Sequence, residues 1–346
     1  MTAAVVLTFA ATLLQLQSLL AVSEKQPNIV FIIADDYGYK DIGYHGAEFA
    51  TPTLDKLAAG GLKLENYYVQ PICSPTRSQL MTGRYQIHTG LQHDIIWPSQ
   101  PYGVSLEYPT LANVLKEHGY STHAIGKWHL GLYKREYTPL HRGFDTFYGY
   151  WEGGEDYYTY YNCDWSHKAE GGDRSSRLGN ENFCGYDLRD MERQVTDKNG
   201  TYSTLLYTHK AVDLLKGKTA ADKPFFLYLA YQAVHSPMEA PESYIKPYEH
   251  IQNKYRRIYA GMVSALDEGV KNVTDTLKQT GLWNNTLLVF TTGITRVSLH
   301  RLYLKLHPTA KLRLGLELRI SLGQGLWMRL KIGLGMRSWD WDRGWG

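Results

Sequence analysis

The sequence predicts an α/β fold in which a mostly parallel sheet is covered by helices on both faces. Strand-like and helix-like segments alternate from residue 28 to residue 292, which is the order typical of parallel sheets with crossover helices. The run at 28–34 is continuously β-branched and aromatic, as expected for a parallel strand buried on both faces. The length of 346 residues and the hydrophobic content of 43% suit one large α/β domain or two smaller ones.

The predicted elements follow one another with recognisable stop signals. The first strand is a β-branched and aromatic run that stops at Asp35-Asp36. The first helix ends at Gly60-Gly61 and the second at Gly119, because glycine commonly terminates helices. Strands are predicted at 28–34, 120–125, 224–231 and 286–292, and helices at 53–59, 110–118, about 202–216 and about 255–280. Ligands of such sheets bind beyond the carboxyl ends of the strands.

Residues 1–23 are predicted to form a secretory signal peptide. An apolar run becomes polar at Gln15, and the small residues Ala21 and Ser23 precede a polar segment, which is the pattern of a signal peptide with its cleavage site. A transmembrane span is less favoured, because the run is shorter than the roughly 20 apolar residues that cross a bilayer. We therefore expect a protein of the secretory pathway, lysosomal or extracellular. Three Asn-x-Thr glycosylation sequons favour the same compartment, at Asn199, Asn272 and Asn284.

Secretion permits disulfides, but the three cysteines of the chain cannot all pair. Cys163 and Cys184 flank a polar, glycine-rich segment, so a disulfide that closes this loop is the natural pairing. Cys73 is then left over, within the stretch PICSPTRSQLMTGRY of residues 71–85. An odd cysteine in a secreted chain requires a chemical explanation. The alternative is an inert buried thiol, the ordinary state of a free cysteine.

The charge of the chain changes sign after residue 293. Residues 1–293 carry 27 Lys and Arg against 31 Asp and Glu, whereas residues 294–346 carry 10 against 3. The net charge of +3 is therefore no indication of nucleic-acid binding, because the basic excess lies in one terminal segment.

Residues 294–346 have an unusual composition. Leucine alternates there with Arg, Lys and Gly without a helical period, and the segment holds four of the nine tryptophans. We predict an aberrant tail that arises from a shifted reading frame, a retained intron or a mistaken gene model. An amphipathic strand or a basic membrane-surface segment is the alternative.

Polar side chains follow three of the predicted strands, at the sheet edge where ligands bind. Asp35 and Asp36 follow the first strand, Lys127 and His129 follow the second, and His235 follows the third. Two adjacent buried carboxylates are costly unless a cation or strong donors neutralise them, so this pair favours a hard cation such as Ca²⁺ or Mg²⁺. The alternative is an ordinary solvent-facing turn. Because the strand ends supply Asp, Lys and His, we predict that they converge on one site.

The stretch around Cys73 resembles the signature of the sulfatase family. Cys73-Ser-Pro-Thr-Arg77, followed by Thr82-Gly83-Arg84, matches the motif in which the cysteine is oxidised after translation to a formylglycine aldehyde. The resemblance covers about residues 26–293 and implies an alkaline-phosphatase-like fold. Within the family the chain looks most like arylsulfatase B and its close relatives, on residues 79–93, 126–131, 142–149 and 281–286.

The resemblance implies a sulfuric ester hydrolase whose nucleophile is formylglycine, made from Cys73 by a formylglycine-generating enzyme. One hydroxyl of the hydrated aldehyde attacks sulfur, and the second expels the sulfate as the aldehyde re-forms. Asp35 and Asp36, with residue 73, would bind Ca²⁺, and Arg77 would stabilise the aldehyde hydrate. The residues that would bind sulfate or handle the proton of the leaving alcohol are Lys127, His129 and His235. The implied substrate is a sulfated glycosaminoglycan sugar of the N-acetylgalactosamine 4-sulfate type, or an aryl sulfate.

The chain departs from the family after the last predicted strand. In the family this strand runs into Asp-Asn-Gly-Gly, whose Asp and Asn complete the metal site, but here it runs into Gly293-Ile294-Thr295-Arg296. Neither Gly nor Ile offers a side-chain oxygen. Because Ca²⁺ prefers about six to eight oxygen ligands, we expect this site to bind Ca²⁺ more weakly than the site of the family. We also expect no counterpart of the family's later sulfate-binding lysine and no C-terminal subdomain. A catalytically inactive, truncated secreted product is the main alternative, and a metallophosphatase of the same superfamily is less favoured.

Overall fold

The computed structural model describes residues 25–64, 67–163 and 184–293, together with the backbone of three short strands after residue 293. The chain divides into two compact units, Asn28–Leu312 and a second made of Met1–Pro27 with Arg313–Gly346. In the second unit, β12 (Arg313–Leu316) pairs antiparallel with β13 (Leu330–Gly333). The predicted signal peptide and most of the predicted tail lie outside the described residues.

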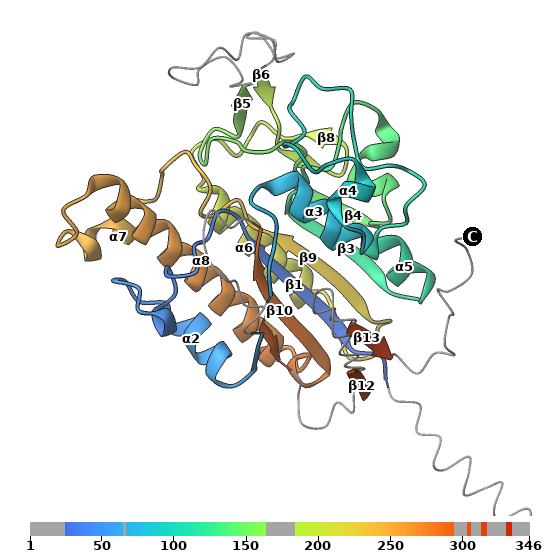
Figure 1. The fold of residues 1–346 in the computed structure, drawn as a ribbon. Helices are drawn as coiled ribbons and strands as arrows, with labels where there is room; N and C mark the ends of the chain where they lie inside the picture. Colours follow the sequence, from blue (N-terminus) through green and yellow to red (C-terminus); the bar gives the residue numbers. More distant parts are fainter. Residues whose placement is uncertain are drawn as a thin grey trace, which may run out of the picture. The chain divides into compact units, whose positions relative to one another are not determined.

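The larger unit is built on a sheet whose central strands are parallel (Figure 1). In the order β10, β1, β9, β3 and β4, each described strand pairs in parallel with the next. The outer strands pair antiparallel, β11 and β2 beyond β10 and β7 and β8 beyond β4. The bounds are β1 (Asn28–Ala34), β2 (Leu62–Lys63), β3 (Ser121–Lys127), β4 (Thr146–Tyr150), β7 (Arg189–Asp190), β8 (Arg193–Gln194), β9 (Phe225–Ala230), β10 (Thr286–Thr292) and β11 (Tyr303–Lys305).

Helices cover both faces of the sheet. Val30 and Ile32 of β1 belong to the core cluster that includes residues of α6 and α8, whereas Phe31 and Ile33 belong to the cluster that includes residues of α3 and α5. This follows from the alternation of side chains along a strand. The helices are α2 (Pro52–Ala59), α3 (Cys73–Thr82), α4 (Gln86–Thr89), α5 (Leu111–Glu117), α6 (Ser203–Lys216), α7 (Glu242–Ile245) and α8 (Lys254–Gln279), with short 3-10 turns η1 (Gly43–His45), η2 (Arg135–Tyr137), η3 (Pro139–His141), η4 (Lys246–Tyr248) and η5 (Trp283–Asn285).

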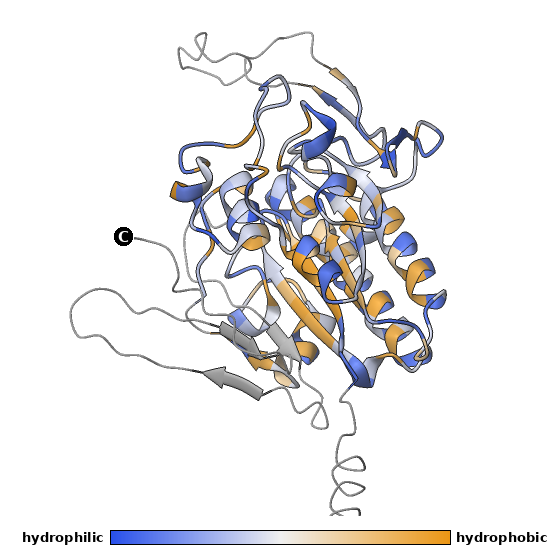
Figure 2. Cartoon of the chain, turned by 90° about the vertical axis from the view of Figure 1, so that its right-hand side faces the viewer, coloured by the Kyte–Doolittle hydropathy of each residue, from blue (hydrophilic) through white to orange (hydrophobic). Residues whose placement is uncertain are grey.

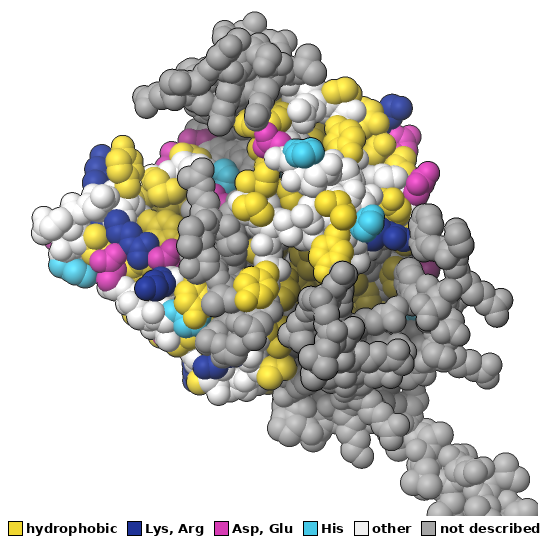
Figure 3. All heavy atoms as spheres, viewed as in Figure 1, with side chains coloured by type: hydrophobic (Ala, Val, Ile, Leu, Met, Phe, Trp, Pro, Cys, Tyr) yellow, Lys and Arg dark blue, Asp and Glu magenta, His cyan; other side chains and the backbone are white. Residues whose placement is uncertain are grey.

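The distribution of hydrophobic and hydrophilic residues agrees with this layering. In Figure 2 the helices carry hydrophobic residues on one side and hydrophilic residues on the other, while the central strands are hydrophobic. Basic and acidic side chains lie beside one another on the face shown in Figure 3. Among the ion pairs of the described residues, Arg256 contacts both Asp41 at 2.7 Å and Glu48 at 2.6 Å. Among the described helices, none combines the length and apolar character needed to cross a membrane.

The predicted α/β fold is confirmed, and most predicted elements lie close to their observed bounds. The strands at 28–34 and 286–292 have the predicted bounds, and the other predicted elements differ by at most two residues at either end. Helix α3 was not predicted, because Pro75 and the polar residues around it give no apolar period. Proline is tolerated in a first helical turn, and Gly83, with φ of 65°, ends the helix in the left-handed conformation.

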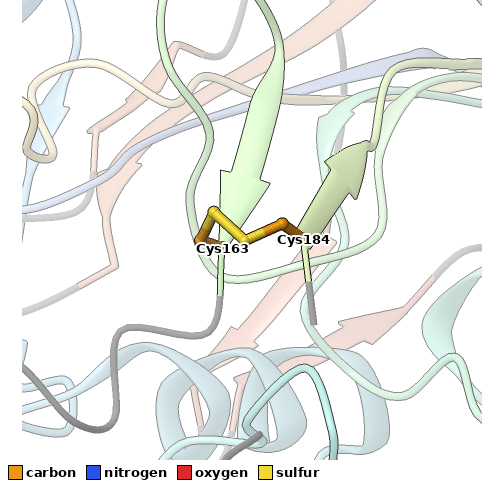
Figure 4. The surroundings of a disulfide bond; sticks show 2 residues. All are labelled: Cys163 and Cys184. Atoms are coloured by element: carbon orange, nitrogen blue, oxygen red, sulfur yellow. A yellow bond between two sulfur atoms is a disulfide. The ribbon is translucent and has the colours of Figure 1, made fainter. Parts of the chain in front are cut away.

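The predicted disulfide is also confirmed. Cys163 and Cys184 are bonded at facing positions of a separate hairpin, β5 (Tyr161–Cys163) and β6 (Cys184–Tyr186) (Figure 4). Cys73 is free, as this pairing requires, and its side chain is buried. Of the three predicted sequon residues, Asn199 and Asn284 are exposed and Asn272 is half-buried on α8.

Candidate active site

The predicted site residues lie at the carboxyl ends of neighbouring parallel strands. Asp35 follows β1, Lys127 is the last residue of β3, and His235 follows β9. The backbones continue to pair beyond the strand ends, since the N–H of Asp35 donates to Ala233 at 2.8 Å and the N–H of Val234 donates to Asp35 at 2.6 Å. These bonds fix the relative positions of the acidic and histidine segments.

Asp35 is the centre of a buried ion-pair network. Its side chain is fully buried, and its two oxygens accept from Lys127 Nζ at 2.6 Å and Arg77 Nη2 at 3.3 Å. Burial alone would raise the pKa of Asp35, but the charges of Lys127 and Arg77 outweigh it and hold the pKa well below its usual range. Asp35 is therefore ionised, and each of its oxygens has a cationic partner.

Cys73 is the first residue of α3 and contacts the same lysine. Its Sγ atom accepts from Lys127 Nζ at 3.2 Å, and the side chain is buried. Burial, reinforced by the negative charge of Asp35, raises the pKa of Cys73 to about 12. Without modification or a bound cation, residue 73 is therefore a neutral thiol rather than a reactive thiolate.

Arg77 lies one helical turn after Cys73 and is fully buried. Besides Asp35, its guanidinium donates to the carbonyl of Lys127 at 3.1 Å and to the hydroxyl of Tyr228 at 3.2 Å. These contacts fix the guanidinium between β3 and β9. Sequence reasoning missed Tyr228, because within the apolar run of β9 it is indistinguishable from a core residue.

Asp36 combines a left-handed backbone with an unsatisfied carboxylate oxygen. Its φ is 55°, which is uncommon for a residue other than glycine. The Oδ1 atom is buried without a hydrogen-bond partner among the described residues, and Oδ2 lies 3.7 Å from His235 Nε2. Burial and then the charge of Asp35 raise the pKa of Asp36. Asp36 Oδ1 is thus an available ligand atom at the carboxyl end of the sheet.

His129 is buried beside this cluster as a neutral imidazole. Its Nε2 donates to the carbonyl of Ile96 at 2.9 Å, and its Nδ1 is buried without a partner among the described residues. Burial, and then the charges of Lys127 and Arg77, lower the pKa of His129 well below its usual range. Because Nε2 carries the proton, Nδ1 offers a lone pair. The hydroxyl of Ser74 donates to the His129 carbonyl at 3.1 Å and connects this residue to α3.

His235 is placed by its own loop and by a tyrosine. Its Nδ1 lies 2.6 Å from the carbonyl oxygen of Ser236, and its backbone carbonyl accepts from the Tyr157 hydroxyl at 2.8 Å. Ligand atoms of Asp35, Cys73 and His235 all lie within 4.8 Å of one another. The structure therefore brings the seven predicted site residues to one end of the sheet.

Gly153 is required by the close approach of its loop to His129. A Cβ atom at Gly153 would lie 2.6 Å from Cε1 and 2.8 Å from Nε2 of the His129 ring, which the bond to Ile96 holds in place. We expect Gly153→Ala to lower the free energy of unfolding by about 1–3 kcal/mol through overpacking, measured by urea denaturation. Gly185→Ala is the matched control, since no atom lies within 4 Å of its added methyl group; equal losses in both variants would contradict the prediction.

Glu155, two residues further on, is a buried carboxyl. It accepts from the hydroxyl of Tyr207, and burial, with a contribution from Asp187, raises its pKa well above the ordinary value of 4.5. The folded chain therefore holds a proton that the unfolded chain releases above pH 4.5, so this contribution to stability is lost as the pH rises toward the raised pKa.

We expect Glu155→Gln to remove that loss, so that the melting temperature of the variant falls less steeply with rising pH than that of the wild-type chain. Melting curves recorded across the pH range from 4.5 upward test this. Glu192→Gln is the control, because its exposed partner Arg135 lowers the pKa of Glu192 instead. Parallel pH profiles of the wild-type chain and Glu155→Gln would refute the assignment of the proton.

Comparison with known proteins identifies the family of this arrangement. The family model described as Sulfatase matches residues 27–293. The chain belongs to the sulfatase family. The predicted family and fold class are thereby confirmed, whereas the finer likeness to arylsulfatase B stays a prediction.

Individual sulfatases match over most of the chain. The chain is 52% identical over 266 residues to arylsulfatase J of Mus musculus, and the aligned region covers 77% of this chain and 42% of that protein. It is 30% identical over 285 residues to N-acetylgalactosamine-6-sulfatase of Mus musculus, covering 79% of this chain and 51% of that protein. The crystal structure of Ps i-CgsB in complex with k-i-k-neocarrahexaose matches with a TM-score of 0.70 and 31% identity, over 82% of this chain and 66% of that one. The chain spans about half the length of these curated relatives.

The donor set of this sulfatase fits a hard cation. Asp36 Oδ1 is a buried carboxylate oxygen without a partner among the described residues, and Asp35 is ionised beside it. Gly293 follows β10, and its Cα lies against Asp35: a Cβ added there would be 3.1 Å from Asp35 Oδ1. Since the glycine side chain adds no oxygen, Asp35, Asp36 and residue 73 are the residues that would hold the cation.

Proposed function

We propose that this chain carries the catalytic centre of a sulfatase that hydrolyses sulfate esters with a formylglycine nucleophile made from Cys73. One observation carries the proposal: in the sulfatase motif, Cys73 starts a buried helix and its Sγ lies 3.2 Å from Lys127 Nζ, at the carboxyl end of a parallel sheet. The competing inert thiol would need no cation beside it and no unpartnered carboxylate nearby. A formylglycine hydrate supplies one hydroxyl for attack at sulfur and another for release of sulfate.

The surrounding side chains suit the charge of a sulfate ester. Lys127 Nζ already donates to the side chain of residue 73 and would hold the nucleophilic oxygen in the same way. His129 Nδ1, a buried lone pair on a neutral imidazole, would accept a hydroxyl proton. His235, which is partly exposed beside Asp36, would bind the sulfate or protonate the leaving alcohol.

The buried cations fix the anionic part of the site. Arg77 is paired with Asp35 and lies on the same helix as residue 73, and it would stabilise the hydrate of residue 73. Asp35, Asp36 and residue 73 would hold Ca²⁺, which would draw electron density from the sulfate oxygens. We further infer a protein of the secretory pathway, lysosomal or extracellular, because its disulfide requires an oxidising compartment.

We infer that the substrate is a sulfated sugar of the glycosaminoglycan type or an aryl sulfate. The family relationship supports this, since the chain is similar to an N-acetylgalactosamine-6-sulfatase and to a structure solved with k-i-k-neocarrahexaose. An N-acetylgalactosamine 4-sulfate group, the finer prediction from the sequence, is the first carbohydrate to test.

Two measurements on the secreted chain test the function. The mass of the proteolytic peptide that contains residue 73 distinguishes formylglycine from cysteine, and hydrolysis of an aryl sulfate is followed with and without added Ca²⁺. We expect a modified residue and Ca²⁺-dependent turnover that is absent from Cys73→Ala. Modification without turnover would leave a non-catalytic sulfatase-like protein, and faster hydrolysis of an aryl phosphate would favour the metallophosphatase alternative.

A further inference from the structure

We propose that the unmodified form of this chain, in which residue 73 is still a thiol, binds Zn²⁺ through Asp35, Cys73 and His235. The three residues follow or begin different elements, β1, α3 and β9, and their ligand atoms lie within 4.8 Å of one another. Within the described residues this is the group of His, Cys, Asp and Glu side chains close enough to share a metal ion. The inference concerns the chain before modification, so it does not depend on the proposed hydrolysis.

The donor atoms determine the choice of metal. Thiolate sulfur, imidazole nitrogen and carboxylate oxygen together are typical ligands of Zn²⁺, and three protein ligands with one open position are the usual arrangement of a reactive zinc site. Calcium instead takes oxygen ligands alone. Conversion of Cys73 to formylglycine replaces the sulfur with oxygen, so this modification would change the preference of the site from Zn²⁺ to a hard cation.

Each of the three ligands already has the supporting contact that metal ligands require. The Ser236 carbonyl oxygen can only accept, so His235 Nδ1, 2.6 Å away, carries the proton and Nε2 keeps the lone pair that binds metal. Cys73 Sγ accepts from Lys127 Nζ at 3.2 Å, a contact that would also stabilise a metal-bound thiolate. Asp35 is held by Lys127 and Arg77. The ligands are thus oriented without the metal.

Asp36 lies beside this group of ligands. Its Oδ2 lies 3.7 Å from His235 Nε2, and its Oδ1 is buried without a partner among the described residues. Bond lengths of about 2.0–2.3 Å separate tetrahedral ligands by about 3.5 Å, so the cluster needs to contract by about 1 Å. As the Zn–S bond forms, the S–H bond breaks and its proton passes to solvent. The thiolate formed by this proton release offsets half of the charge of the dication.

Cobalt titration of the thiol form tests the proposal. The full chain is produced in an oxidising compartment of a host without the modifying activity, and the mass of the residue-73 peptide verifies that the thiol is present. Co²⁺ serves as the spectroscopic probe, because a thiolate ligand gives it a charge-transfer absorption in the near ultraviolet. We expect one equivalent of Co²⁺ to produce this absorption, Zn²⁺ to displace it, and an excess of Ca²⁺ to leave it in place.

Two variants test the ligands Cys73 and His235, and a third is the control. Cys73→Ser is expected to abolish the absorption, and His235→Ala to weaken Co²⁺ binding by at least about tenfold. His250→Ala is the matched control, since His250 is exposed, and it should bind Co²⁺ like the wild type. Circular dichroism establishes that each variant is folded. A folded thiol form that takes up no Co²⁺, an absorption that survives in Cys73→Ser, or displacement by Ca²⁺ as readily as by Zn²⁺ would each overturn the proposal.

Discussion

Replacing Asp35 with Asn is expected to lower the free energy of unfolding by about 3–5 kcal/mol, the usual cost of removing one partner from a buried ion pair. The change preserves the shape of the side chain but removes its charge. Lys127 at 2.6 Å and Arg77 at 3.3 Å would then both lie in a fully buried position without a paired anion. Urea denaturation of the wild-type chain and the variant measures the loss.

An exposed aspartate provides the control for this prediction. Asp275 contacts Lys271 at 2.8 Å and Lys278 at 2.9 Å on the outer face of α8, and Asp275→Asn should cost less than about 1 kcal/mol because solvent screens such pairs. Adding Lys127→Met to Asp35→Asn should recover part of the stability, since it removes one of the uncompensated charges. A loss for Asp35→Asn no larger than that for Asp275→Asn would show that the buried network contributes little.

The central sheet could be predicted from the sequence because burial on both faces leaves a local signal. Strands β1 and β10 are continuous apolar runs, and their bounds agree with the prediction. The antiparallel edge formed by β7 and β8 was not predicted, since each has only two residues and such short strands form through pairing with a neighbour rather than through local preference. Helix α3 was missed for a related reason, because its residues are buried by tertiary contacts.

The candidate site was predictable where chemistry and strand ends coincide. Asp35, Lys127 and His235 stand out because they are charged or titratable side chains at or shortly after the ends of predicted strands. Gly153 and Tyr157 gave no such signal, as their importance lies in contacts with His129 and His235 that join distant parts of the chain. The prediction of an aberrant tail at 294–346 remains untested, because only short strands are described there.

Cys73→Ser is expected to stop the proposed hydrolysis after a single transfer. The serine oxygen would take the place of Sγ beside Lys127 Nζ, at 3.2 Å in the present structure, and it can attack the sulfur of a bound ester. It has no second hydroxyl from which to expel the sulfate, so the sulfate ester stays on residue 73. We expect turnover to fall by at least about a thousandfold and the peptide that contains residue 73 to gain the mass of one sulfuryl group.

Cys73→Ala separates this outcome from a general loss of the site. Alanine offers no oxygen, so this variant should lose turnover to the same extent without acquiring a sulfuryl group. Both substitutions remove the contact between Lys127 and Sγ but leave the pairing of Asp35 with Lys127 and Arg77, so both variants should fold. Sustained turnover by Cys73→Ser would mean that a plain hydroxyl suffices and that the second hydroxyl of formylglycine does not release the sulfate. Turnover by Cys73→Ala would place the nucleophile elsewhere, because no side-chain atom beyond Cβ would then remain at residue 73 to attack the ester.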